Sequence, residues 1–248
     1  MNSRWNELLG AVFGLVAWYL LSAVPRYRMF MPWPHEVFAF LLSPAVFVLL
    51  KPAVLTCIVV FLAMAISSVC GYIIGCWMGL SKSARVFYIP LSVFKSSPIS
   101  VFIPVFMVLF GLKYFTFPML CIPVVSMVAI NISNLLKELP AHRLTQRRLL
   151  RLPLIVYLRD IVFWETLPAF LATARIAFPF CLTLQIALDY FLPTQGGLGA
   201  LIRRQYDEYD YICMYAATVI VCILGYCLLA IVDRTSERLL KWKTATSS

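Results

Sequence analysis

Three ionisable side chains lie inside long apolar stretches of this sequence, and their chemistry demands an explanation. Lys95, Arg175 and Asp189 each have hydrophobic neighbours over a length that suits a membrane span. A charged side chain inside a span is costly and usually marks a pathway for ions or substrate. Arg175 and Asp189 are fourteen residues apart, about four helical turns, so on one helix each needs another partner. Arg175 allows two interpretations. In the first, its side chain extends to the membrane surface or bonds to backbone carbonyls; in the second, it faces a pathway and attracts an anion. Lys95 allows the same two interpretations.

The sequence contains no pattern for catalysis of its own. It has no GxxxxGK[ST] stretch that would cradle phosphates. His35 and His142 stand alone, without the spacing of a catalytic triad or a metal site. The eight cysteines form no CxxC pair and lie mostly in apolar runs, so we expect small packing residues rather than a disulfide framework or a metal site. We therefore expect a protein that is not an enzyme and that binds no cofactor.

A long basic connection, residues 137–165, separates two of the apolar stretches. Its arginines alternate with leucine, isoleucine and valine at roughly helical spacing, which predicts two short amphipathic helices. Pro140 and Pro153 punctuate these helices. One interpretation is an interfacial segment that lies on anionic lipid. The other is a docking element whose apolar and basic faces fill a groove on a cytoplasmic protein.

Membrane spans are the elements that must position these residues. Hydrophobic residues make up 62% of the chain and charged residues 13%, against about 45–50% and about 25% in soluble domains. A span needs about 20 apolar residues. Six stretches qualify, namely residues 8–24, 54–80, 86–111, 115–136, 167–192 and 211–232. Residues 38–50 form a shorter stretch, where we expect an interfacial or re-entrant helix. The sequence thus predicts an all-α integral membrane protein with about six transmembrane helices in one domain, residues 1–248.

The charge distribution predicts an orientation. The first stretch is long for a signal peptide and five more follow, so we expect an uncleaved span. With both termini in the cytoplasm, thirteen of the 21 basic residues lie inside and six outside, which satisfies the positive-inside rule. The net charge of +10 then needs no nucleic acid as a partner. The acidic residues Asp207, Glu208 and Asp210 lie outside, either as a solvated loop or as a contact patch for an extracytoplasmic partner.

Six local patterns follow one another along the chain, and each is a turn, a small-residue stripe or a polar or proline-rich interruption of an apolar run. They are the proline-rich stretch from Met31 to Val37, Thr56, the glycines Gly71, Gly75 and Gly79, the proline-interrupted run from Pro98 to Gly111, Asp189 with Gly197-Leu198-Gly199, and the closing segment from Asp233 to Trp242. Small residues at four-residue spacing allow another helix to approach closely. From about residue 32 to residue 242 this order resembles the permease subunits of bacterial ABC importers, in the branch that handles sulfonates, taurine, nitrate and related solutes.

The resemblance implies a fold, a function and a set of partners. The fold is the helical bundle of a type I ABC importer permease. The function is translocation of a small solute, such as a sulfonate, taurine, nitrate or a thiamine-precursor pyrimidine, across the bacterial inner membrane. The partners are cytoplasmic ABC ATPase subunits, an extracytoplasmic solute-binding protein and a second permease copy, most simply in a homodimer surrounded by lipid.

The family's coupling motif reads Glu-Ala-Ala, three residues, Gly, nine residues, then Ile-x-Leu-Pro. Aligning Ile161 with the Ile places Thr145, Gln146 and Arg147 at Glu-Ala-Ala and Arg151 at Gly, so the spacing is kept and the signature residues are not. The resemblance assigns the contact with the ATPase to this segment, namely to Arg143, Thr145, Gln146, Arg147, Arg148, Arg151 and Ile161.

A second family motif places an acid before Gly-Leu-Gly at the end of the fifth span. Asp189 stands where the family has Glu, so the charge is kept. The glycines Gly196, Gly197 and Gly199 are expected to form a tight turn at the membrane surface.

Two other functions stay open. A secondary transporter or channel would need paired acidic groups at mid-membrane and broken helices in two corresponding halves, whereas Asp189 is the one candidate acid and no internal repeat is visible. A membrane scaffold or assembly factor stays open because the coupling signature is eroded. Neighbouring genes for an ATPase and a binding protein would favour import.

Overall fold

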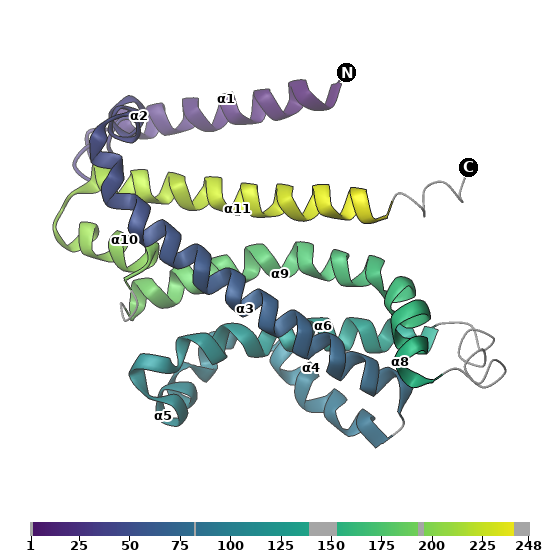
Figure 1. The fold of residues 1–248 in the computed structure, drawn as a ribbon. Coiled ribbons are helices and arrows are strands. Elements are labelled where there is room, and N and C mark those ends of the chain that lie inside the picture. The colour runs from purple at the N-terminus through teal and green to yellow at the C-terminus, as the bar shows by residue number, and fades with distance from the viewer. Residues whose placement is uncertain (1, 82, 139–152, 193–195, 241–248) are drawn as a thin grey trace. The chain divides into compact units, whose positions relative to one another are not determined.

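The computed structural model describes residues 2–81, 83–138, 153–192 and 196–240, and over these residues the chain is helical and without strands. This confirms the predicted all-α fold. The elements in chain order (Figure 1) are α1 (Asn2–Ala23), α2 (Pro34–Leu42), η1 (Pro44–Val46), α3 (Phe47–Leu80), η2 (Ser83–Phe87), α4 (Tyr88–Ser96), η3 (Ile99–Phe102), α5 (Ile103–Tyr114), α6 (Thr116–Glu138), α8 (Leu154–Tyr157), the π-helix η4 (Leu158–Val162), α9 (Phe163–Phe191), α10 (Leu198–Asp207) and α11 (Tyr211–Leu239).

Within the described ranges, four helices are long and apolar enough to cross a membrane, namely Pro44–Leu80, Thr116–Glu138, Ile155–Phe191 and Tyr211–Leu239. A fifth candidate is the bent pair Ser83–Ser96 and Ile99–Tyr114. The described apolar part of α1, Val12–Ala23, is shorter than these. The described residues therefore contain four to five candidate spans, where the sequence predicts about six.

The stretch expected as a continuous span over residues 86–111 is instead broken. The two halves meet at an angle of 106°. Ser97, which ends α4, is extended with ψ 145°, and Pro98 follows it. Proline lacks the amide donor of a helix interior and disfavours helical geometry in the residue before it, so the break falls at this dipeptide.

The short stretch over residues 38–50 is divided among three helical elements, the end of α2, the short helix η1 (Pro44–Val46) and the start of α3. Pro34 begins α2, where the carboxylate of Glu36 accepts a hydrogen bond of 3.0 Å from the Trp33 amide. Ser43 is extended, which ends α2, and α3 begins at Phe47. Residues 47–50 therefore belong to the long helix α3 rather than to a separate interfacial helix.

Two compact units make up the chain. Unit 1 contains residues 1–56 and 186–224, and unit 2 contains residues 57–185 and 225–248. The helices α3, α9 and α11 contribute residues to both units, so the predicted single domain over residues 1–248 stays a prediction.

Unit 1 has a small apolar core formed by parts of α2, α3, α10 and α11. Its buried members are Val37, Leu49, Leu198, Leu201, Cys213, Ala216 and Ala217. Trp18 of α1 packs against this core, and its ring stacks on that of Tyr215 with 5.8 Å between the ring centroids. The indole Nε1 of Trp18 also donates a hydrogen bond of 3.2 Å to the Pro32 carbonyl. These contacts connect α1 and the loop after it to the first residues of α11.

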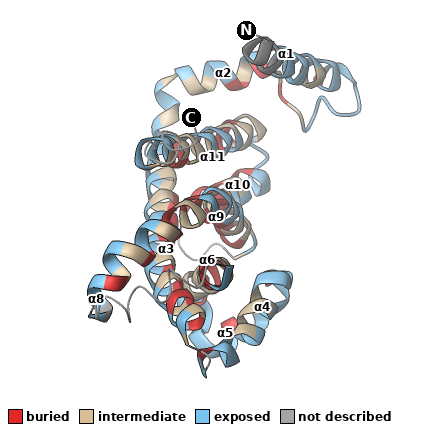
Figure 2. Ribbon diagram, turned by 90° about the vertical axis from the view of Figure 1, so that its right-hand side faces the viewer, coloured by how far each residue is buried: buried red, intermediate tan, exposed pale blue. Residues whose placement is uncertain are grey.

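Unit 2 is built around α6. Of the most apolar 18 residues of α6, 61% are buried, against 17–33% in the other three spans, and Figure 2 shows this concentration of buried residues along α6. The glycine stripe of α3 packs on it. A Cβ atom at Gly75 would lie 2.8 Å from the Ala129 carbonyl oxygen, and one at Gly79 would lie 2.7 Å from Leu136 Cβ. The predicted close approach of a helix at these glycines is therefore made by α6.

Candidate functional site

The segment predicted to contact an ATPase is described only at its end. Arg143, Thr145, Gln146, Arg147, Arg148 and Arg151 lie outside the described residues. Ile161, the seventh residue, is half-buried in the π-helix η4. The helix that includes η4 runs from Ile155 to Phe191, so it begins before the start expected at residue 167. Ile161 is therefore joined to the fifth predicted span by uninterrupted helix.

A hydrogen bond connects the first turns of α9 to α3. The hydroxyl of Thr166 donates to the Val162 carbonyl at 2.8 Å and lies 3.0 Å from the hydroxyl of Tyr72. Because the Thr166 proton is used on Val162, Tyr72 is the donor to Thr166. The rings of Phe163 and Phe170 pack edge-on against the ring of Tyr72, with 6.1 Å between the ring centroids in each pair. The helix that follows the predicted coupling segment is thus held against the second span.

Arg175 has a carboxylate partner. Its Nε lies 3.1 Å from Oδ1 of Asp233, which joins α9 to α11. The two side chains keep 60% and 35% of their surface exposed. This ion pair supplies the separate partner that Arg175 needs if it is to lie in a span.

Lys95 belongs to a chain of polar side chains that crosses three helices. Its Nζ donates to Oδ1 of Asn131 at 2.9 Å, which joins α4 to α6. The Asn131 amide nitrogen donates to Thr173 Oγ1 at 3.0 Å, and Thr173 donates to the Ala169 carbonyl at 2.7 Å. The network thus ends on the backbone of α9.

Asp189 lies in unit 1, beneath the glycine-rich turn that starts α10. Its side chain is 1% exposed. A Cβ atom at Gly197 would collide with the Asp189 carboxylate and would lie 2.7 Å from Thr56 Oγ1. Gly196 has φ +72°, which L side chains rarely adopt. The structure therefore brings together Asp189, Thr56 and the turn, which the sequence places in three separate patterns.

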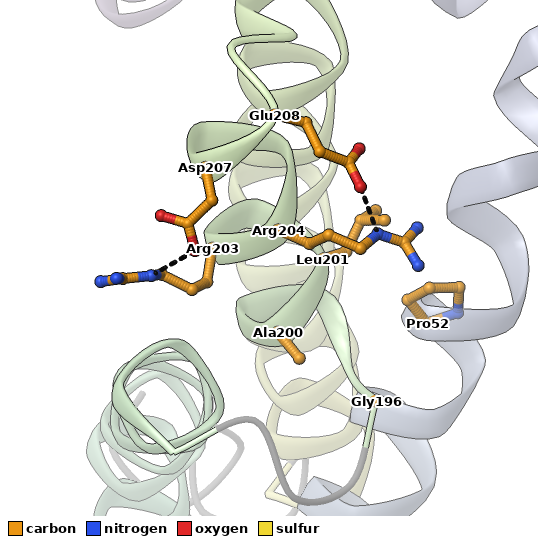
Figure 3. Close-up of a pocket in the computed structure, with 8 residues that line it drawn as sticks. All are labelled: Pro52, Gly196, Ala200, Leu201, Arg203, Arg204, Asp207 and Glu208. Atoms are coloured by element: carbon orange, nitrogen blue, oxygen red, sulfur yellow. Dashed lines mark hydrogen bonds and ion pairs between the residues drawn. The ribbon is translucent and has the colours of Figure 1, made fainter.

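The helix α10 carries two ion pairs and lines a pocket. Arg203 Nε lies 2.9 Å from Asp207 Oδ2, and Arg204 Nε lies 3.9 Å from Glu208 Oε1. Figure 3 shows the two pairs on different sides of the helix. The pocket has a volume of about 480 Å³ and is lined by Pro52, Gly196, Ala200, Leu201, Arg203, Arg204, Asp207 and Glu208. The hydrogen bond to Asp207 raises the pKa of Arg203, so this exposed arginine stays charged.

The predicted acidic cluster is divided among different partners. Asp207 and Glu208 pair with the arginines one turn earlier on α10. Asp210 accepts a hydrogen bond of 3.1 Å from the Cys213 amide, which caps the start of α11. Part of the cluster therefore has a structural role, and the two ion pairs remain on an accessible surface.

Sequence reasoning did not identify Asn131 as the partner of Lys95, or Asp233 as the partner of Arg175. Asn131 is a polar residue in an apolar stretch, which is a signal that it needs a polar contact, whereas Asp233 follows directly after the apolar stretch 211–232 and gives no such signal. The identity of that contact depends on which helices pack together. Within the described ranges no group of three His, Cys, Asp or Glu side chains is placed to hold a metal ion, and the eight cysteines are unbridged.

Comparison with known proteins identifies one family and several solved structures with a similar fold. A family model described as "Binding-protein-dependent transport system inner membrane component" matches residues 67–241. Two solved structures of the MetNI methionine ABC transporter in inward-facing conformations have a similar fold. The CY5 native crystal form gives a TM-score of 0.67 at 19% identity and covers 79% of this chain and 98% of that chain. The CY5 SeMet soak crystal form gives a TM-score of 0.65 at 21% identity and covers 79% of this chain and 99% of that chain. A search of curated protein sequences finds no match.

Proposed function

The chain belongs to the family of binding-protein-dependent transport system inner membrane components, the permease components of ABC importers, and we propose that it carries a small solute across a bacterial inner membrane. The observation that carries the proposal is the family match, which extends from the middle of α3 to the end of α11. The predicted family and the type I importer fold are thus confirmed. The branch for sulfonates, taurine and nitrate stays a prediction.

The proposed assembly contains a second copy of this chain and two cytoplasmic ATPase subunits. The solute pathway lies between the copies, and ATP binding and hydrolysis on the separate ATPase subunits rock the copies between two states. Residues 137–165 bind the ATPase and both chain termini are cytoplasmic. In support of this, the described end of that segment continues as helix into α9, and the Tyr72–Thr166 hydrogen bond connects α9 to α3. A displacement of the segment would therefore move α9 and α3 as rigid elements.

A solute-binding protein docks on the opposite side of the membrane. We assign this contact to the exposed surface of α10. Arg203 and Arg204 alternate there with Asp207 and Glu208 around the pocket. Accessible charges of both signs favour one orientation of the docked binding protein and raise the rate at which it associates with the permease. The solute is small, and taurine, other sulfonates, nitrate and a thiamine-precursor pyrimidine are the candidates that the sequence resemblance suggests.

Co-purification with an ATPase encoded near the gene tests this function. The intact chain is expected to retain the ATPase in detergent, and deletion of residues 143–151 is expected to release it while the spans remain inserted. Replacing Arg203 and Arg204 by Gln is the matched control, since it removes positive charge on α10 and should leave the ATPase bound. An intact chain that retains no ATPase would contradict the importer function. An ATPase that stays bound to the deletion variant would contradict the docking role alone.

The energy source separates an importer from a secondary transporter. Uptake by the reconstituted complex should stop when vanadate blocks ATP hydrolysis and should persist when ionophores collapse the ion gradients. The opposite response would favour the secondary transporter.

A further inference from the structure

We propose that Lys95 and Asn131, next to the break between α4 and η3, bind an anionic oxygen group of the transported solute, such as a sulfonate, a carboxylate or nitrate. This inference rests on the proposed function and narrows its substrate class. Three observations support the inference: the hydrogen bonds of Lys95, the charges around Lys95 and the broken helix beside Lys95.

The hydrogen-bond network fixes how Asn131 is oriented. The only hydroxyl proton of Thr173 is donated to the Ala169 carbonyl, so Thr173 must accept from Asn131. The amide nitrogen of Asn131 therefore faces Thr173, and its oxygen faces the Lys95 ammonium. A flipped amide would put its N–H groups against a cation and lose both bonds. Lys95 is thus held by a neutral acceptor that positions its charge without cancelling it.

The charge of Lys95 is not balanced by a carboxylate within the part of the chain that the structure describes. The ion pairs found there involve Arg159, Arg175, Arg203 and Arg204. Arg175 shows what a balanced cation looks like, since its partner Asp233 lies 3.1 Å away. An ammonium has three N–H donors, and the described contacts of Lys95 use one. An incoming anionic oxygen would supply both the missing charge and further acceptors.

The backbone beside Lys95 is itself typical of a binding site. Lys95 is the next-to-last residue of α4, and the break at Ser97-Pro98 turns the chain by 106°. The rings of Phe94 and Phe102 pack across the break at 5.0 Å, which holds the bend. Irregular backbone at membrane depth occurs where it is buried in protein or lines a water-filled cavity. Discontinuous helices of this kind form the substrate sites of many transporters.

A structural role for Lys95 makes a different prediction from an anion site. If Lys95 only holds α4 against α6, any N–H donor of similar length restores its function, so Lys95→Gln should work. If its charge binds the solute, Lys95→Arg should work and Lys95→Gln should not. Lys113 is the matched control because it is a lysine of the same bent pair, on α5, and its Nζ lies over the Tyr114 ring at 5.4 Å.

The test uses proteoliposomes that contain the full chain, its ATPase and its binding protein. The probes are labelled taurine, methanesulfonate, nitrate and the neutral pyrimidine precursor of thiamine. We expect uptake of at least one of the first three. Lys95→Gln should lower that uptake about tenfold or more, as expected for losing one charge-assisted contact. Lys95→Arg should stay within about threefold of the unsubstituted protein and Lys113→Gln within about twofold, differences of well under 1.4 kcal/mol.

A second variant balances the charge of Lys95 and keeps the contact between Lys95 and residue 131, although residue 131 then has no N–H to donate to Thr173. Asn131→Asp would place a carboxylate against Lys95, and the resulting ion pair should abolish uptake of the anionic probes in a chain that still inserts and retains the ATPase. Wild-type protein that transports only the neutral pyrimidine, or none of the probes, would overturn the inference. So would full uptake by Lys95→Gln or Asn131→Asp, or equal losses in Lys95→Gln and Lys95→Arg. These outcomes leave the proposed function intact while the ATPase remains bound to the intact chain, and loss of the ATPase from that chain would count against the proposed function instead.

Discussion

The backbone N–H of Leu198 donates a hydrogen bond of 2.9 Å to Thr56 Oγ1, although 142 residues separate the two. The bond joins the first residue of α10 to α3 within unit 1, and the donor and acceptor are both buried. It satisfies one of the amide groups that a helix start leaves without an intrahelical partner. Thr56 thus acts as an N-terminal cap supplied from a distant part of the chain.

Thr56→Val should destabilise the protein because valine has the shape of threonine and no acceptor. The buried Leu198 amide would lose its partner, at a cost of about 1–3 kcal/mol. Thermal unfolding in detergent measures the effect. Thr218→Val is the control, since Thr218 is exposed and its hydroxyl bonds within its own helix, to the Met214 carbonyl. Equal melting temperatures for the two variants would show that the Thr56 bond contributes nothing.

Gly75→Ala should weaken the packing of α3 on α6. The new Cβ would lie 2.8 Å from the Ala129 carbonyl oxygen and 2.9 Å from Ile132 Cβ, and neither backbone nor Cβ atoms can move aside alone. Shifts of this kind cost about 1–3 kcal/mol, more than the roughly 1 kcal/mol by which alanine favours a helix over glycine. Gly14→Ala in α1 has no atom within 4 Å of its Cβ and should not destabilise the protein. The yield of folded protein and its melting temperature compare the two; a Gly75→Ala variant as stable as the Gly14→Ala control would contradict the close contact.

The sequence predicts the helices well because apolar length and proline positions are local properties. Four of the six expected spans coincide with α3, α6, α9 and α11 apart from their ends. The prolines indicate an interruption near residue 98, yet the bend of 106° also depends on the contact between Phe94 and Phe102. A local pattern can place such a break, whereas its angle depends on packing.

The candidate site is predicted in parts rather than as a whole. Thr56, Asp189 and Gly197 each stand out in the sequence, but their contact depends on how α3, α9 and α10 pack. The same holds for Lys95 with Asn131, where 36 residues separate the partners. The sequence indicates that a charged side chain inside an apolar helix needs a partner, and the tertiary structure identifies that partner.

Arg175→Gln should impair the protein by leaving Asp233 with its charge and without its partner. The two side chains keep 60% and 35% of their surface exposed, so we expect the lost ion pair to cost about 0.2–1 kcal/mol. Reversing the pair, with Arg175→Asp and Asp233→Arg together, should restore much of the loss. The unsubstituted protein, Arg175→Asp, Asp233→Arg and the double variant form a double-mutant cycle, read out by membrane insertion and uptake. Unchanged uptake by Arg175→Gln at normal protein levels would exclude both a pathway role and a necessary ion pair.

Tyr72→Phe should weaken the connection between ATP hydrolysis and transport while leaving the ATPase bound. The substitution keeps the ring against Phe163 and Phe170 and removes the donor to Thr166, so α9 and α3 would no longer be tied by that hydrogen bond. Losing one neutral hydrogen bond corresponds to roughly a two- to tenfold effect. We therefore expect solute uptake per ATP hydrolysed to fall by about this factor, with the amount of co-purified ATPase unchanged. Tyr226→Phe, at an exposed position of α11, is the matched control and should keep the normal ratio. A Tyr72→Phe variant that also keeps the normal ratio would show that motion passes from the cytoplasmic segment to the spans without this contact.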